Sequence, residues 1–155
     1  MSATLILCCL LVLAACSTVV PPIAGTATPS AAIRDITLTP TKAAIIGQAV
    51  STLVDPPIPL GQTIVRLAQV FWNDDHTDGA YVLEGASSPS TVSDNNGFFA
   101  FANILPGDYV VVVGNVNAQY EIISQADGKP VIYTVAADST LDVGTLAAAL
   151  STQSP

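Results

Sequence analysis

Residues 94–114 read DNNGFFAFANILPGDYVVVVG, and this stretch decides the predicted fold. Side chains alternate between the two faces of a β-strand, so Phe99 and Phe101 would share one face while Phe98 and Ala100 take the other. A run of valines with the same alternation follows. Aromatic and β-branched strands separated by tight turns are typical of a β-sandwich, in which apolar faces pack between two sheets.

The turns on either side of the phenylalanines are expected to form sharp corners. Asn and Gly in DNNG tolerate the positive φ angles of a tight hairpin, so this turn would join a strand at 91–93 to one at 98–103. In LPGD, Pro106 fixes its own φ and Gly107 accepts a positive φ, which fits a type II turn.

The strand after the second turn is apolar on both faces. Alternation places Tyr109, Val111 and Val113 between the sheets and leaves the intervening valines on the outer face. An apolar strip of this kind needs cover. We expect the cover to come from the protein's own chain, such as the N-terminal tether or Phe98, rather than from a partner.

From residue 43 onward the chain consists of short β-rich runs separated by Gly, Pro, Asn and Asp, without helical periodicity of useful length. This pattern predicts an all-β fold, an antiparallel β-sandwich of about seven to eight strands. The expected strands are 44–53, 63–72, 80–84, 91–93, 98–103, 109–113, 131–135 and 140–146.

The same spacing resembles the carboxypeptidase regulatory-like domain, a transthyretin-like sandwich, over about residues 43–146. IIGQAV and PIPLGQTIVRL are similar to that family's first two strands, and YTVAADSTLDVGTL to its closing strand pair. The resemblance implies a non-catalytic domain, because this domain accompanies zinc carboxypeptidases without containing their active site. The matching positions of the central pattern are Ser93, Asp94, Gly97, Phe99, Phe101, Leu105, Pro106, Gly107, Tyr109, Val111 and Val113.

The chain departs from that family after the second strand, where residues 68–87 read AQVFWNDDHTDGAYVLEGAS. The family runs on quickly at this point to its Asp-Gly turn. We expect the inserted residues to form a longer second strand and an extra hairpin.

The N-terminal residues predict an extracytoplasmic location. Residues 5–15, LILCCLLVLAA, suit a secretory signal and are too short for a permanent membrane helix. LAAC at 13–16 resembles the lipobox of bacterial lipoproteins, which implies a signal peptide at 1–15 and a diacylated Cys16 anchored in the membrane. The alternative is an ordinary signal peptide with Cys16 incidental, and the segment MSAT lacks the Lys or Arg of most signals.

The remaining segments flank the predicted sandwich at 43–146. Residues 16–42 are rich in Ser, Thr, Pro and Ala and predict a flexible tether, in which 33–38 alternates like an edge strand. Ser17 after the cysteine would favour the outer membrane of a two-membrane cell, by the lipoprotein sorting rule. Residues 147–155 are expected to form a C-terminal tail.

Composition excludes several classes of function. The chain carries a net charge of −8 and four scattered basic residues, so it lacks the clustered Lys and Arg that nucleic acid requires. The cysteines all lie at or before position 16, which leaves no thiol in the sandwich. The single histidine, His76, lacks the sequence partners of a catalytic zinc or a nucleophilic triad. The sequence predicts a non-enzyme without a cofactor, whose partners are the membrane through its anchor and an envelope protein or polysaccharide.

The acidic segment NDDHTDG at 73–79 is a weak metal candidate. Oxygen ligands from Asp74, Asp75 and Asp78 would suit calcium, but the EF-hand position for a bidentate Glu is occupied by Gly85. Asn, Asp and Gly are also the favoured residues of a hairpin tip. We therefore predict a solvated turn at this place.

Two aromatic residues, Trp72 and Tyr81, flank that tip. Exposed side by side, their rings would stack on sugars, whereas packing against each other across the hairpin is the structural alternative. The sequence predicts a membrane-anchored lipoprotein whose non-catalytic sandwich serves in binding, adhesion or scaffolding. A carbohydrate-binding module of the cell envelope and a structural spacer are the alternatives.

Overall fold

The computed structural model describes residues 29, 35–84 and 87–152, and these residues form ten β-strands. No helix among them is long and apolar enough to cross a membrane. The strands are β1 (Ala43–Ser51), β2 (Ile58–Pro59), β3 (Ile64–Trp72), β4 (Gly79–Val82), β5 (Ser90–Val92), β6 (Phe98–Ile104), β7 (Gly107–Gly114), β8 (Tyr120–Ile122), β9 (Ile132–Val135) and β10 (Thr140–Ala148).

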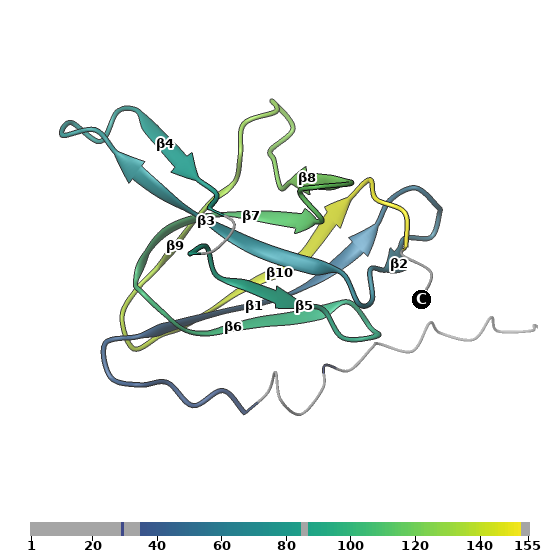
Figure 1. Cartoon of the computed structure of the whole chain (residues 1–155), viewed down its shortest axis with the longest axis horizontal. Coiled ribbons are helices and arrows are strands. Elements are labelled where there is room, and N and C mark those ends of the chain that lie inside the picture. The colour runs from purple at the N-terminus through teal and green to yellow at the C-terminus, as the bar shows by residue number, and fades with distance from the viewer. Residues whose placement is uncertain (1–28, 30–34, 85–86, 153–155) are drawn as a thin grey trace, which may run out of the picture.

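The strands form two sheets that pack face to face as an all-β sandwich, as predicted (Figure 1). The first sheet contains β1, β2, β6 and β10, and the second contains β3, β4, β5, β7, β8 and β9. Most pairs are antiparallel, but β10 runs parallel to β1, from Thr140 beside Ala44 to Ala148 beside Ser51. This one parallel pair arises because β9 belongs to the second sheet, so the chain changes sheets before β10 begins.

Both predicted corners connect the two sheets. β5 pairs with β3 and β6 pairs with β1, so DNNG crosses between sheets instead of closing a hairpin. Asp94 organises this corner, because its Oδ1 accepts hydrogen bonds from the backbone N–H groups of Asn96 and Phe98, both at 2.9 Å. Gly107 has a φ of +150°, whereas a type II turn needs about +80°, so the predicted turn type is also wrong.

The second corner is closed by a tyrosine. Tyr109 Oη donates a hydrogen bond to the carbonyl oxygen of Leu105 at 2.8 Å, which ties the beginning of β7 to the LPGD segment. Burial raises the pKa of Tyr109 above its ordinary value of 10.0. The hydroxyl therefore remains protonated, and able to donate this bond, at neutral pH.

The apolar core lies between the sheets, on the faces predicted from alternation. Phe99 and Phe101 are 0% and 4% exposed, and their rings meet edge to face with centroids 5.9 Å apart. Phe98 lies on the other face of β6 and is half-buried. The other residues predicted to face inward, Tyr109, Val111 and Val113, are buried as well. Thr63, Val65 and Leu67 are also buried.

The outer face of β7 is covered by the protein's own chain, as expected. Val110 is 1% exposed and belongs to a second apolar cluster. Among the described residues, the cover comes from the insertion and from β8, whereas Phe98 lies in the first sheet and was the wrong candidate. Most of the predicted tether lies outside the described residues. The cluster contains Ala68, Val70 and Val110, with Trp72, Leu83 and Ile122 packed against it.

The ends of the sandwich differ from the predicted limits. β10 continues to Ala148 and Leu150 is 4% exposed in the core, so part of the predicted C-terminal tail belongs to the sandwich. Ser51 Oγ donates to the Leu150 carbonyl at 2.6 Å. Residues 35–38 form no strand, so the predicted edge strand at 33–38 is wrong over its described part. The short strands β2 and β8 were not expected.

Candidate functional site

The insertion forms a hairpin that projects from the second sheet (Figure 1). β3 pairs with β4 from Gln69 opposite Val82 to Trp72 opposite Gly79. The longer second strand and the extra hairpin are therefore confirmed. Because the hairpin projects, its large side chains stay accessible, and Phe71 and Tyr81 are 54% and 41% exposed.

Asn73 closes the tip of this hairpin. Its Oδ1 accepts from the backbone N–H groups of Thr77 and Asp78 at 2.9 and 3.1 Å, and its Nδ2 donates to Thr77 Oγ1 at 3.0 Å. Asp74 and Asp75 are exposed on the same tip, as is Asp78. Within the described residues, no three His, Cys, Asp or Glu side chains gather as metal ligands. The tip is thus organised by one amide side chain.

Calcium is expected to leave the unfolding temperature unchanged, because the side chain of Asn73 already hydrogen-bonds to the backbone of the loop without an ion. A bound ion would stabilise the folded state by RT ln(1 + [L]/Kd), about 2.7 kcal/mol at a hundred times Kd. The measurement is thermal unfolding in millimolar calcium and in chelator. A rise of several degrees that vanishes in the combined variant Asp74→Asn and Asp78→Asn would reveal a calcium site instead.

Trp72 and Tyr81 lie on one face of the hairpin without pairing directly. Trp72 is opposite Gly79, and Tyr81 is opposite Val70, so the two aromatic residues are diagonal neighbours. Both residues line one groove. Trp72 is half-buried, and Tyr81 is exposed.

The groove has a volume of about 490 Å³, which lies within the usual range of small-molecule sites. Val70 and Val110 contribute apolar surface from β3 and β7. The hairpin provides one side of the groove, and the segment between β8 and β9 provides Gln125 and Lys129 on the other, with Ile132 at the beginning of β9. Figure 1 shows the hairpin and this segment extending from the same side of the second sheet.

Asp108 holds the indole of Trp72 through a contact that local sequence patterns do not predict. Trp72 Nε1 donates to Asp108 Oδ2 at 2.7 Å, and Thr134 Oγ1 donates to Asp108 Oδ1 at 2.6 Å. Both carboxylate oxygens are therefore engaged. The network joins β3, β7 and β9.

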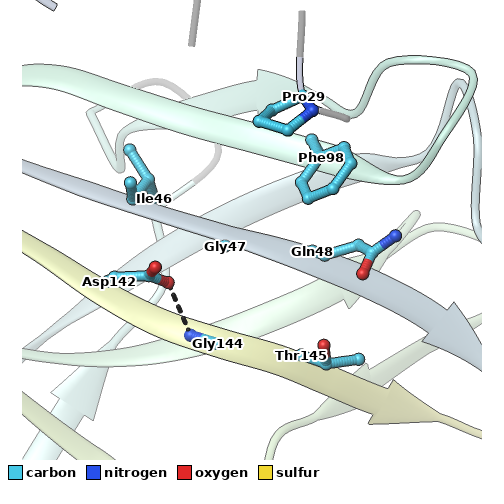
Figure 2. Close-up of a pocket in the computed structure, with 8 residues that line it drawn as sticks. All are labelled: Pro29, Ile46, Gly47, Gln48, Phe98, Asp142, Gly144 and Thr145. Atoms are coloured by element: carbon cyan, nitrogen blue, oxygen red, sulfur yellow. Dashed lines mark hydrogen bonds between the residues drawn. The ribbon is translucent and has the colours of Figure 1, made fainter. Parts of the chain in front are cut away.

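A second, smaller hollow lies on the outer face of the first sheet (Figure 2). It has a volume of about 210 Å³ and lies over the irregularity in the β1–β10 pairing. Pro29, from the predicted tether, lies beside Phe98 in this hollow, and Asp142 accepts a hydrogen bond from the Gly144 N–H at 2.8 Å. The acidic side chain of this hollow, Asp142, is already hydrogen-bonded within β10. The hollow therefore has fewer polar groups available to a ligand than the groove has.

The remaining predicted site residues are separate from the groove or outside the described residues. His76 is exposed at the hairpin tip, with its ring centroid 6.2 Å from that of Trp72. The signal peptide at 1–15 and the lipidation site Cys16 lie outside the residues that the structure describes.

Comparisons with known proteins assign the chain to no family. No protein-family model matches it, and no curated protein matches it. Similar solved structures include the major pilin subunit of Bacillus cereus, with 16% identity and a TM-score of 0.42 over 70% of this chain and 30% of that one. A candidate carbohydrate-binding protein of Pseudomonas aeruginosa has 18% identity and a TM-score of 0.44 over 72% of this chain and 92% of that one.

A minor pilin of Streptococcus agalactiae has 15% identity and a TM-score of 0.42 over 75% of this chain and 48% of that one. The chain therefore spans less than half the length of either pilin. At these identities and TM-scores the likenesses carry no functional argument, so the function is argued from the groove itself.

Proposed function

We propose that the chain is a lipoprotein anchored outside the cytoplasmic membrane through diacylated Cys16, and that its sandwich is a non-catalytic binding module. The observation that carries the binding role is that Trp72 and Tyr81 line one open groove. The resemblance to the carboxypeptidase regulatory-like domain belongs to the same proposal and agrees with a non-catalytic role.

The groove favours a binding module over a structural spacer. A spacer needs a stable sandwich, to which the insertion contributes by covering the outer face of β7, but it needs no open groove. The hairpin instead keeps Tyr81 exposed and shapes a concave surface of ligand size. Aromatic side chains with one accessible face contribute large contact areas to binding sites at low conformational cost.

The anchor is supported by the N-terminal sequence. LAAC lies at the end of an apolar run that has the length of a signal segment, and Cys16, the residue proposed to be lipidated, is its last residue. Each buried methylene of an acyl chain contributes about 0.8 kcal/mol, so two chains on one cysteine give stable attachment. The following Ser-, Thr- and Pro-rich residues would hold the sandwich away from the bilayer.

Loss of Cys16 is expected to abolish lipid attachment. Cells that express the full chain and grow on a labelled fatty acid should label the wild type, whereas Cys16→Ser should carry no label and leave the membrane fraction. Cys9→Ser is the matched control and should keep its label, because that residue lies inside the predicted signal segment. Label retained by Cys16→Ser would refute the anchor and leave the groove as a separate question.

A further inference from the structure

Trp72 is held in the groove by a hydrogen bond and by packing, and it is half-buried, so part of its ring surface stays open to a ligand. Its only polar atom, Nε1, is bound to Asp108, and Asp108 is bound in turn to Thr134. A satisfied indole N–H has no need of water or of a polar ligand group. The indole therefore presents apolar ring surface in a defined orientation, and the entropy cost of ordering it is already met before a ligand arrives.

Gly79 is the second element that positions the indole. A Cβ at this position would lie 2.9 Å from Trp72 Cε3 and 3.1 Å from Cζ3, so any larger residue would push the ring away. Gly79 pairs directly with Trp72 and itself lines the groove. The ring thus lies close against the backbone of β4 at Cε3 and Cζ3. At Nε1 it is held by the hydrogen bond to Asp108.

The polar lining of the groove combines hydrogen-bond donors with acceptors. Lys129 brings an ammonium group, Asp78 brings a carboxylate, and the amide of Gln125 provides both a donor and an acceptor. Thr77 adds a hydroxyl. Sugar hydroxyls also both donate and accept, and the C–H groups of a pyranose form an apolar face that fits an aromatic ring. This combination of surfaces matches a saccharide.

The charges of the groove discriminate among ligands that an aromatic ring could bind. Lys129 Nζ lies 3.8 Å from Asp127 Oδ2, and Asp78 lines the same groove, so the positive charge of Lys129 is balanced by neighbouring carboxylates. A polyanionic glycan would meet Asp78 and a chain of net charge −8. A neutral ligand avoids this repulsion.

We propose that this groove binds a neutral pyranose saccharide, with the apolar face of one sugar ring on Trp72 and its hydroxyls on Asp78, Gln125 and Lys129. The proposal rests on the proposed function, because it names the ligand class of the same groove. Asp108 acts as a positioning residue, since it reaches the ligand only through the indole.

The fluorescence of Trp72 provides the test, because this is the only tryptophan in the chain. The acylated full chain is purified in a polyoxyethylene detergent, which carries neither sugar nor ammonium groups. The probes are neutral oligosaccharides of glucose, mannose, galactose and N-acetylglucosamine, together with oligogalacturonate and choline. We expect a saturable change of emission, and protection from iodide quenching, with at least one neutral oligosaccharide and with neither charged probe.

Variants locate the response within the groove, with calorimetry as the readout wherever tryptophan is removed. Trp72→Ala is expected to weaken the affinity for the responding oligosaccharide by about tenfold or more, which corresponds to about 1.4 kcal/mol. Phe71→Ala is the matched control, because Phe71 is exposed on the same hairpin but does not line the groove, and it should bind like the wild type.

The role of Asp108 requires a readout beyond affinity. Without any ligand, Asp108→Ala should make Trp72 more accessible to iodide and shorten its fluorescence anisotropy decay, while Asp108→Asn keeps an oxygen acceptor for the indole and should restore part of both. Identical quenching in the wild type and in Asp108→Ala would overturn the positioning role.

The remaining outcomes separate the ligand class from the binding role. A saturable response to choline or oligogalacturonate alone would overturn the neutral saccharide and retain a binding groove. No response to any probe would also overturn the saccharide, whereas the anchor is judged independently by the fatty-acid label. An equal loss of affinity in Phe71→Ala and Trp72→Ala would overturn the groove as the site.

Discussion

Phe99→Ala is expected to lower the free energy of unfolding by about 3–5 kcal/mol. The side chain is 0% exposed, and its ring lies edge to face with that of Phe101, so the substitution removes an aromatic contact and leaves a cavity. Small domains have about 5–15 kcal/mol in total, so this loss is a large share of the stability. Phe101→Ala should behave alike, and denaturant unfolding curves measure both.

Phe98→Ala is the matched control for these two variants. It removes the same side chain from the same strand, but from the half-buried outer face beside Pro29 (Figure 2). A clearly smaller loss is expected, because less apolar surface leaves contact with the protein. Equal losses at all three positions would contradict the assignment of faces along β6.

Gly97→Ala is expected to have the next largest effect, a loss of more than about 2 kcal/mol. The φ of Gly97 is +79°, which costs other residues about 1–2 kcal/mol. A methyl group would also lie 2.3 Å from the carbonyl oxygen of Ala49. That oxygen accepts the N–H of Leu60 at 2.9 Å, and the Ala49 N–H donates to the Gly97 carbonyl at 2.8 Å, so relief of the clash disturbs two backbone hydrogen bonds.

Gly128→Ala separates the two contributions. Gly128 has nearly the same φ, +83°, but a Cβ there would meet no atom within 4 Å. The control therefore carries the backbone strain without the steric contact, and the difference between the two unfolding free energies measures the contact with β1. Equal losses would show that the corner at Gly97 can move away from β1 at little cost.

Local patterns were sufficient to predict the long strands of the sandwich and their inward faces. Phe99, Phe101 and Val111 could be assigned because alternation along one strand is a property of neighbouring residues. Sheet pairing was not predictable in the same way. DNNG has the turn chemistry of a hairpin whether its strands pair with each other or with different sheets, and only the pairing of β5 with β3 and β6 with β1 decides between them.

The candidate site was predicted in part, for a similar reason. Trp72 and Tyr81 could be predicted as candidates because they flank a turn, which is local information. The bond from Trp72 to Asp108 depends on the register of β3 against β7, in which Gln69 lies opposite Tyr109. Lys129 reaches the groove from a segment far along the chain. Neither contact has a signal in the residues beside it, so the second side of the groove could not be predicted.

Backbone amide chemical-shift mapping tests most directly whether the groove is the binding surface of this protein. The labelled full chain in polyoxyethylene micelles is titrated with the same neutral oligosaccharides. We expect saturable shifts to cluster at the amides of Trp72, Gly79 and Tyr81 and of residues 125–132, with the hollow around Phe98 and Gly144 unaffected. Saturable shifts centred on that hollow, or no saturable shift at the hairpin and at 125–132, would contradict the assignment of the groove.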